Sequence, residues 1–345
     1  AYWTGQLAGV PVLELPTDRR RPPVKGFRGA TRSFVLDPSL SRAIKEFSAR
    51  QGVTPYMTLS AAFAVLLHRY ARQDDVVFGS PIANRNRAEL EGLIGFFANM
   101  LVMRVDVSGN PVFTELLARI SAMTLDAYAN QDIPFEQLVE KLRPERDPSR
   151  NPLFQVAIAL HNEAATPPAV AGLEIGHPVI PACDASEFGI EITTTRFDLE
   201  LHLWEGSEGM RGTWAFDVAL FDADTIDRMG RHLVQILRGI VEDPTRRISD
   251  LDMLTRAERD VLLREWGPNV VPYPRDAPVH ALFERQCAAS PDAVALVYGD
   301  REMRYAELNA RANQLARYLG RADLRPGSLV GVCMERGVDL IVTLL

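Results

Sequence analysis

Residues Ser80–Met100 read SPIANRNRAELEGLIGFFANM and connect two apolar runs, which we predict to be strands at 75–79 and 100–107. Arg85, Arg87 and Asn99 therefore lie close to the ends of buried strands. Polar groups in such places need hydrogen-bond partners, because burying them unpaired is costly. The residue types alone fit a satisfied loop between core elements equally well, so the function of this stretch depends on the motifs around it.

The composition indicates a soluble globular protein whose 345 residues suit two domains. The net charge is −7 and the basic residues are scattered, so neither nucleic acid nor an anionic membrane is indicated as a partner. Three distant cysteines, at 183, 287 and 333, form neither a disulfide framework nor a CxxC metal motif, which predicts a cytoplasmic protein. No apolar run reaches the roughly 18 residues of a membrane span.

Apolar periodicity predicts an α/β chain in which helices and strands succeed one another. The expected helices are near 39–51, 56–72, 111–128, 134–142 and 223–242, and further strands are expected at 154–160, 188–194, 197–204 and 211–217. Residues 1–36 look irregular apart from one short strand. A proline-rich connector follows, and beyond it helices alternate with strands, including SLVGVCM at 328–334. This alternation is typical of the start of a parallel α/β domain.

Familiar catalytic signatures are absent: the sequence has no GxGxxG, Walker loop, GxSxG or HExxH. None of the six histidines has another histidine beside it along the chain. We interpret His68 and His232, on predicted helices, as structural, and His161, at a strand end, likewise. Asp147 and Arg150 flank a turn, where local capping explains them as well as catalysis does.

Several motifs in a fixed order carry more information than any one of them. They are YWTGQLAG, LELPTDRRRP, SPIANRNRAELEGLIGFFANMLVMR, NQDIPFEQLVEKL and RDPSRNPLFQV. Together, over about residues 1–250, they closely resemble the condensation domains of nonribosomal peptide synthetases. The following RISDLDMLTRAERDVLLREW and FERQCAASPDAVALVYGDREMRYAELNARANQLARYL resemble the entrance to an amino-acid adenylation domain, an AMP-binding enzyme.

This resemblance implies a chloramphenicol acetyltransferase-like C-terminal condensation subdomain, with a mixed sheet and flanking helices, over 1–247. A linker at 248–277 and the start of the adenylation domain at 278–345 are expected to follow. The chain begins with Ala1 and stops inside an apolar run, so we expect a fragment of one elongation module. The missing N-terminal condensation subdomain and the rest of the adenylation domain are then its partners.

The implied activity joins an acyl or peptidyl thioester to the amine of an aminoacyl thioester. Both are held on the phosphopantetheine arms of upstream and downstream peptidyl carrier proteins. The site must position two ends, manage a proton and stabilise an oxyanion. In the family these tasks centre on an HHxxxDG loop, which this chain does not contain, so we assign no catalytic residue. ATP and Mg²⁺ are expected only with a complete adenylation domain, whose binding motifs would lie beyond Leu345.

The resemblance also implies which residues support the tunnel of the condensation domain. Arg85, with Arg87 in reserve, is the candidate to pair with the aspartate of the HHxxxDG loop. Asn99 matches the asparagine of an IGFFVNT pattern, in which Ala98 and Met100 depart from the usual residues. The other candidates come from NQDIPFE and RDPSRNPLFQ, where Asn130 replaces a common histidine; they are Gln131, Asp132, Arg150 and Asn151.

Three functions are compatible with these residues. The chain can be part of a peptide synthetase, a non-catalytic scaffold that binds carrier proteins, or a stand-alone acyltransferase, which the connector and the adenylation-like tail disfavour. We expect the isolated fragment to be inactive and poorly soluble. We also expect the polar residues of Ser80–Met100 to lack partners, since Arg85 would face a loop absent from this chain.

Overall fold

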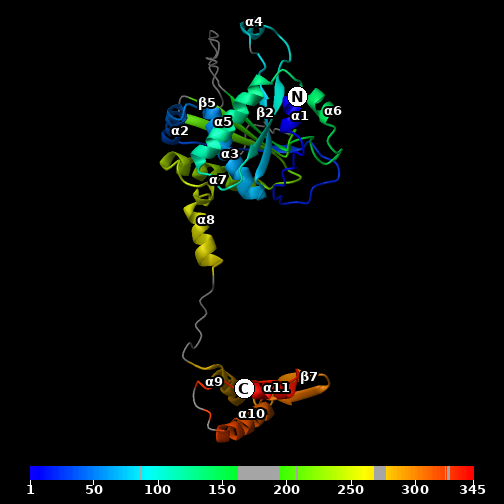
Figure 1. Ribbon diagram of the computed structural model, residues 1–345, viewed down its shortest axis with the longest axis vertical. Coiled ribbons are helices and arrows are strands. Elements are labelled where there is room, and N and C mark those ends of the chain that lie inside the picture. The colour runs from blue at the N-terminus through cyan, green and yellow to red at the C-terminus, as the bar shows by residue number, and fades with distance from the viewer. Residues whose placement is uncertain (86, 162–193, 207–208, 268–276, 323, 325–326) are drawn as a thin grey trace, which may run out of the picture. The chain divides into compact units, whose positions relative to one another are not determined.

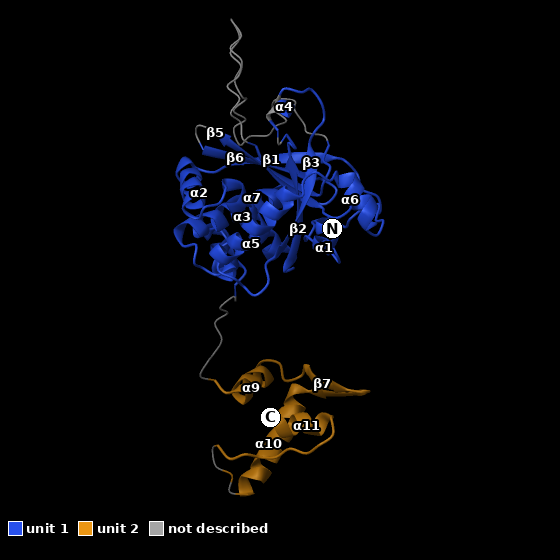
Figure 2. Cartoon of the chain, turned by 45° about the horizontal axis from the view of Figure 1, so that its top comes forward, with its two compact units in different colours: residues 1–267 blue, residues 268–345 orange. Residues whose placement is uncertain are grey.

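A computed structural model describes residues 1–345 except 86, 162–193, 207–208, 268–276, 323 and 325–326. The chain divides into two compact units, residues 1–267 and 268–345 (Figure 2). This division falls inside the predicted linker at 248–277. Within the described residues, no helix has both the length and the apolar character needed to cross a membrane.

The first unit is built on a six-stranded mixed sheet (Figure 1). Its strands are β1 (Gly29–Val35), β2 (Asp75–Ile82), β3 (Asn99–Asp106), β4 (Val156–His161), β5 (Leu199–Gly206) and β6 (Gly209–Asp217), in the order β1-β6-β5-β4-β2-β3. The pairs β2–β4 and β4–β5 are parallel and the other pairs are antiparallel. The predicted strand at 188–194 lies almost wholly outside the described residues.

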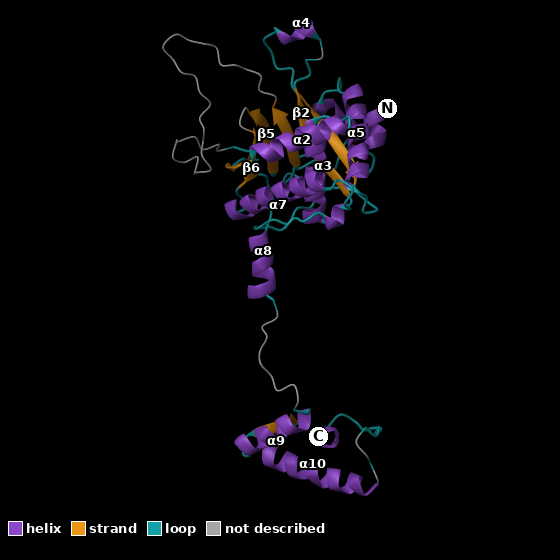
Figure 3. Cartoon of the chain, turned by 90° about the vertical axis from the view of Figure 1, so that its left-hand side faces the viewer, coloured by secondary structure: helices purple, strands orange, loops and turns teal. Residues whose placement is uncertain are grey.

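The longer helices of the first unit cover one face of this sheet (Figure 3). The described α-helices of this unit are α1 (Tyr2–Gln6), α2 (Pro38–Arg50), α3 (Pro55–Ala71), α4 (Ala88–Glu91), α5 (Phe113–Ala129), α6 (Phe135–Leu142), α7 (Ala223–Glu242) and α8 (Arg256–Asp260), with a 3₁₀ helix at Ile248–Asp250 and a π-helix at Val261–Glu265. The predicted helices near 39–51, 56–72, 111–128, 134–142 and 223–242 are confirmed. Helix α1 is an addition to a segment predicted to be irregular; the indole of Trp3 is buried and donates to the carbonyl of Asn130 at 2.8 Å.

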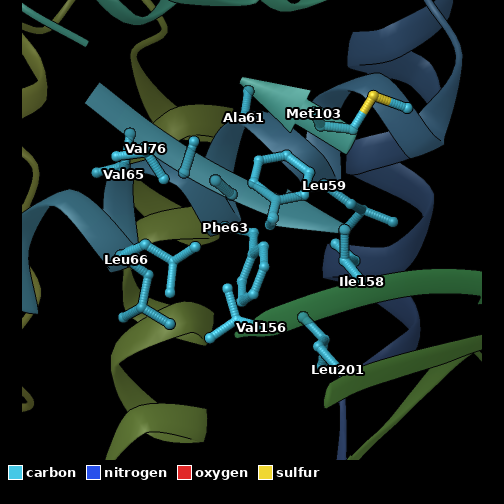
Figure 4. Close-up of a cluster of buried hydrophobic side chains, with 14 of the residues drawn as sticks. Leu59, Ala61, Phe63, Val65, Leu66, Val76, Met103, Val156, Ile158 and Leu201 are labelled. Atoms are coloured by element: carbon cyan, nitrogen blue, oxygen red, sulfur yellow. The ribbon is translucent and has the colours of Figure 1, made fainter. Parts of the chain in front are cut away.

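Helix α3 forms the centre of the core because it is apolar on most faces. Thr54 caps its first turn by accepting from the backbone N–H of Met57 at 3.3 Å. Phe63 then packs edge-on against Phe78 of β2, and β4 and β5 present Val156, Ile158 and Leu201 to the same cluster (Figure 4). This contact explains the strict alternation in β5, where Leu199, Leu201 and Leu203 are fully buried on the helix side.

Two glycines in the sheet are covered by phenylalanine rings. A Cβ atom on Gly79 of β2 would overlap the ring of Phe154, and one on Gly212 of β6 would overlap the ring of Phe34. A missing side chain on one strand therefore makes room for an aromatic ring from another segment. This is a recognised use of glycine inside sheets.

The second unit contains α9 (Val279–Ala289), β7 (Val294–Tyr298), β8 (Arg301–Arg304), α10 (Tyr305–Leu319), a short turn at Gly320–Ala322 and α11 (Val338–Leu344). Two expectations are wrong here. Strands β7 and β8 form an antiparallel hairpin rather than the beginning of a parallel sheet. The described residues of SLVGVCM form no strand, and Leu329 within them is 99% exposed. A strand needs a neighbour for its backbone groups, and none of the described residues forms a strand ladder with this segment.

Candidate functional site

The carboxyl ends of β2, β4 and β5 meet at one edge of the sheet, because these three strands are parallel. Strand β2 ends at Ile82, β4 at His161 and β5 at Gly206. The connection between β2 and β3, residues 83–98, leaves from this edge and carries α4 (Figure 1). Ligand sites of α/β sheets commonly form at such an edge, so the predicted stretch Ser80–Met100 occupies a suitable place.

Arg85 organises the connection at 83–98. Its guanidinium donates hydrogen bonds to the carbonyl oxygens of Leu90 and, at 3.3 Å, Gly95, and it lies 4.3 Å from the ring centre of Phe97. The expectation that Arg85 would lack partners is therefore wrong. The connection folds back on itself and supplies acceptors and an aromatic surface of its own. An unpaired Arg85 would have supported a pairing with an absent carboxylate, and the structure does not provide that support.

The outer surface of this connection is apolar. Leu93 is 51% exposed, Phe96 92% and Ile94 fully exposed. Arg87, the reserve candidate, is exposed and immediately precedes α4, where its backbone carbonyl accepts from the N–H of Leu90 at 2.9 Å. Large apolar side chains gathered at the end of a loop are typical of contact surfaces.

Asn99 joins the start of β3 to the turn before α6. Its amide NH₂ donates to the carbonyls of Gln131, at 3.0 Å, and Ile133, at 2.9 Å. Its side-chain oxygen accepts from the backbone N–H groups of Met100, at 2.9 Å, and Phe135, at 3.0 Å. Asn99 thus uses the hydrogen-bonding capacity of its amide fully, and the expectation of missing partners is wrong for it too.

Gln131 and Asp132, which were assigned through the separate motif NQDIPFE, are brought next to Asn99 by these bonds. The carbonyl of Gln131 is an acceptor for Asn99, while Asp132 lies between the two carbonyls and is exposed. Sequence reasoning placed the three residues in one site, and the structure joins them through the backbone of the turn.

Arg150 and Asn151 make their contacts with other segments. Arg150 pairs with Glu14 at 2.9 Å and with Asp147 at 3.4 Å, and its buried Nη1 has no hydrogen-bond partner among the described residues. The hydroxyl and backbone N–H of Ser149 lower the pKa of Asp147, and the charge of Arg150 adds to this. Asn151 donates to the carbonyl of Arg196 at 2.6 Å. These contacts hold the entry to β4 against the N-terminal segment and the entry to β5.

One polar cluster at the same edge of the sheet was missed. Nε2 of His161 lies 3.1 Å from Nδ1 of His202, and Nε2 of His202 lies 3.4 Å from the carboxylate of Glu200. The ring of Trp204 lies beside His161, with 4.9 Å between ring centres. Along the chain the two histidines are 41 residues apart, so only the pairing of β4 with β5 brings them together. The alternation of His202 and Trp204 with buried leucines was the available signal.

A cleft of about 450 Å³ lies where β2 begins and β3 ends, lined by Gly5, Gln6, Asp74, Asp75, Arg104 and Asp106. Arg104 donates to Asp75, at 2.7 Å, and to the carbonyls of Gln6 and Ala8, both at 2.9 Å. These bonds join β2, β3 and the N-terminal segment, so we interpret the cleft as structural. Among the residues that the structure describes, no group of three or more His, Cys, Asp or Glu side chains is arranged to hold a metal ion.

Comparison with known families accounts for both units of the chain. Residues 1–263 match the condensation domain family, and residues 283–345 match the AMP-binding enzyme family. The chain is 41% identical to one of the linear gramicidin synthase proteins of Brevibacillus parabrevis, covering all of this chain and 7% of that protein. It is 42% identical to a chondramide synthase of Chondromyces crocatus, covering all of this chain and 9% of that protein. The chain therefore spans less than a tenth of either relative.

Solved structures agree with this. The X-domain from teicoplanin biosynthesis, in its complex with OxyB, is 32% identical with a TM-score of 0.64, over 74% of this chain and 55% of that one. A four-domain nonribosomal peptide synthetase bound to AMP and glycine has a TM-score of 0.75 at 22% identity, over 94% of this chain and 25% of that one, which supports the fold. The mixed α/β fold and the order of the motifs lead to one conclusion: the chain belongs to the condensation domain family of nonribosomal peptide synthetases, with the beginning of an AMP-binding domain after it.

Proposed function

We propose that this chain supplies the C-terminal part of a condensation domain and the start of an adenylation domain to a peptide synthetase that forms amide bonds. The amine of an aminoacyl thioester attacks the carbonyl of an acyl or peptidyl thioester; a C–N bond forms, a C–S bond breaks and a thiol leaves. The observation that carries the proposal is the match along the whole chain to peptide synthetases, with the condensation and AMP-binding matches in the same order.

The proposed partners follow from that chemistry. Two peptidyl carrier proteins present the thioesters on phosphopantetheine arms, and a complete adenylation domain uses ATP and Mg²⁺. We assign none of these groups to residues of this chain. A cytoplasmic location is part of the same proposal.

In this proposal the connection at 83–98 contacts the N-terminal half of the condensation domain. Its exposed Leu93, Ile94 and Phe96 supply the apolar surface for that contact. Arg85 keeps the connection in shape from inside, through Leu90, Gly95 and Phe97. Asn99 fixes where the connection rejoins the sheet. These residues position the site, while the histidine of the HHxxxDG loop is expected on another segment.

The test is product formation by a synthetase module that carries this chain, with both carrier proteins loaded. We expect amide product from the module and none from the 345-residue chain alone. Asn99→Ala should reduce the rate at least about tenfold, because the turn at 131–135 loses its anchor. Asn313→Ala, on the exposed surface of α10, should leave the rate unchanged. An intact module that never yields amide product contradicts the proposed function. Amide product from the isolated chain contradicts the expectation that this chain alone is inactive.

A second candidate function is a scaffold that binds another protein. The observation that favours it is the 32% identity to the X-domain of teicoplanin biosynthesis, which was solved in complex with OxyB. A scaffold would keep its partner bound after Asn99→Ala if the surface used lies elsewhere, and it would yield no amide product at all. The loaded-carrier assay therefore separates the two functions.

A further inference from the structure

Residues 243–267 leave the body of the first unit in two stages. The first stage is firmly packed: Ile248 and Leu251 are buried, and Arg69, in the last turn of α3, donates to the carbonyl of Ile248 at 3.2 Å. The second stage is α8 with the π-helix at Val261–Glu265, and neither contains a buried residue. Figure 1 shows α8 extending away from α7. The position of α8 therefore depends on polar contacts.

Glu258 makes the contacts that join α8 to the body of the unit. Its carboxylate lies 3.3 Å from Nε2 of His232 on α7, and 3.8 Å from the guanidinium of Arg231, whose side chain is 53% exposed. Glu258 also completes the capping box of α8, because Oε2 accepts from the backbone N–H of Thr255 at 2.8 Å and from its hydroxyl at 2.7 Å. The carboxylate that caps α8 is thus the group that reaches α7.

Beyond Glu258 the described polar contacts are exposed or local. Arg259 lies 3.8 Å from Asp252, and both side chains are at least 65% exposed. Arg264 pairs with Asp260, one turn earlier, at 3.3 Å. Exposed ion pairs of this kind contribute little to stability. Among the described residues from 255 to 267, Glu258 is therefore the one that forms an ion pair with a buried side chain of the body.

His232 is held on its other side by Tyr70 of α3. The hydroxyl of Tyr70 lies 2.7 Å from Nδ1 of His232, and the ring centres are 5.8 Å apart. Burial raises the pKa of Tyr70 to about 12, so the phenol keeps its proton near neutral pH and can donate a hydrogen bond. His232 is 3% exposed, and burial lowers its pKa although Glu258 opposes that shift. The imidazole is therefore neutral near pH 7.

The charge of Glu258 decides which nitrogen of His232 carries the proton. Burial opposes the ionisation of Glu258, but the hydroxyl and backbone N–H of Thr255 outweigh burial and lower its pKa. An ionised carboxylate only accepts hydrogen bonds, so Nε2, the nitrogen beside it, carries the proton of the neutral ring. Nδ1 is then the acceptor for Tyr70. One buried imidazole thus connects α3, α7 and α8.

Two buried polar atoms remain at this junction. Nε2 of His232 and Oε1 of Glu258 have no hydrogen-bond partner among the described residues. One is a donor and the other an acceptor, and they belong to two side chains that are already in contact. Leaving such atoms without a partner is costly. Positions of α8 that keep the carboxylate beside this N–H are therefore favoured over positions that withdraw it.

We propose that His232 is a positioning residue that fixes α8 against α7 and so sets the direction in which the chain leaves the first unit. Its consequence for amide formation rests on the proposed function. The residues after α8 lead along the chain to the AMP-binding part at 283–345. Freedom at α8 adds to the freedom of this connection, and a looser connection lowers the effective concentration of one tethered group at another.

The first test measures amide hydrogen exchange in the 345-residue chain. In His232→Leu, exchange at residues 256–265 should rise about tenfold, because α8 loses its contact with the body. His232→Gln should restore slow exchange, since its amide can donate to Glu258 and accept from Tyr70. Arg231→Ala removes only the exposed partner of the same carboxylate and should change the exchange by less than about twofold.

Unchanged exchange in α8 of His232→Leu overturns the proposal. A rise that is equally large in α3 and α7 overturns it too, because His232 would then support the core rather than α8. Histidine labelled with ¹⁵N gives a measurement on the parent chain that needs no variant. Near pH 7.5 we expect the proton of His232 on Nε2, and a proton on Nδ1 would overturn the assigned contact with Glu258.

The second test compares two activities of a synthetase module that carries this chain. His232→Leu should lower the rate of amide formation about threefold and leave amino-acid activation, followed by ATP–pyrophosphate exchange, unchanged. His232→Gln should return amide formation to the parent rate. Equal losses of both activities would show a folding defect and overturn the positioning role, as would an unchanged amide rate in His232→Leu. If the parent module makes no amide, the proposed function fails, and the exchange and histidine spectra alone decide on His232.

Discussion

The two faces of the central strands are stabilised in different ways. On the helix side, Leu199, Leu201 and Leu203 of β5 meet the aromatic cluster around Phe63. On the other side, the alternate residues of the same strand continue a series of charges and hydrogen bonds. These residues are Asp198, just before the strand, and Glu200 and His202 within it; the ring of Trp204 lies beside those of His161 and His202.

The two faces differ in how strictly they require particular residues. Apolar packing depends on volume and tolerates substitutions of similar size. A buried ionised group depends on particular partners at particular distances, so removing a single partner is costly. Asp198 is the clearest case: it is 3% exposed and pairs with Arg21 at 2.5 Å and with Lys25 at 3.0 Å. The helix side forms the core, and the polar side ties remote segments to it.

The largest effect is expected on the helix side. Phe63→Ala should lower the free energy of unfolding of the first unit by about 3–5 kcal/mol, because its fully buried ring leaves a cavity. Phe96→Ala, at a 92% exposed position, is the control and should change it by less than about 0.5 kcal/mol. Urea denaturation of the full chain, followed by the transition of the first unit, measures both. Equal effects would show that the helix side is not the core.

The next effect is expected at Asp198. Asp198→Ala should cost about 3 kcal/mol, since Arg21 and the nearly buried Lys25 lose their carboxylate. Asp292→Ala removes a 90% exposed carboxylate 3.8 Å from Arg304 and should cost less than about 1 kcal/mol in the second unit. A cost at Asp198 as small as that at Asp292 would remove the distinction between the two faces.

Asn99 tests the comparison at the edge of the sheet. Asn99→Ala should destabilise the first unit by about 2 kcal/mol, because the carbonyls of Gln131 and Ile133 and the N–H of Phe135 lose their partner. Hydrogen exchange should rise at Phe135 and in α6, and the core helix α3 should stay protected. Faster exchange throughout the first unit would mean that Asn99 supports the whole fold rather than this junction.

The smallest effect is expected from the charge of Glu200. Its pKa is lower in the folded than in the unfolded chain, so its contribution is present above the unfolded value of about 4.3 and is lost as pH falls through the folded value. Glu200→Gln should therefore flatten the acid-side decrease of stability between about pH 5 and 3, by no more than about 1 kcal/mol. Parallel stability curves for parent and variant over this range would contradict the assigned shift.

The sequence was informative wherever a pattern is local. Helix α3 could be predicted from its apolar run. The mixed sheet could be predicted because the motifs resemble those of a known family. Asn99 and Gln131 were placed in one site by their motifs alone. The bonds between them, however, use backbone atoms of a turn, and backbone geometry leaves no mark in residue types.

The failures have a physical explanation of the opposite kind. His161 was interpreted as structural, and that stays a prediction; what no local pattern could show is that the β4–β5 pairing places His202 beside it. Arg85 was expected to await a distant carboxylate, but carbonyl groups of its own connection satisfy it. SLVGVCM has the composition of a strand and no strand beside it among the described residues. The residue types of a segment indicate which structure it prefers, but the segments packed beside it decide which structure it forms.

The rings that cover Gly79 and Gly212 have a consequence for how this sequence can change over time. At each site the glycine and its phenylalanine, Phe154 or Phe34, fill one shared volume. A side chain added at the glycine has no room while the ring remains, and a smaller residue in place of the ring leaves a void above a bare backbone. Neither the glycine nor the phenylalanine of a pair can be replaced alone without loss of stability. Each pair can therefore change only through two linked substitutions, with a single-substitution intermediate that is less stable than the starting and final sequences.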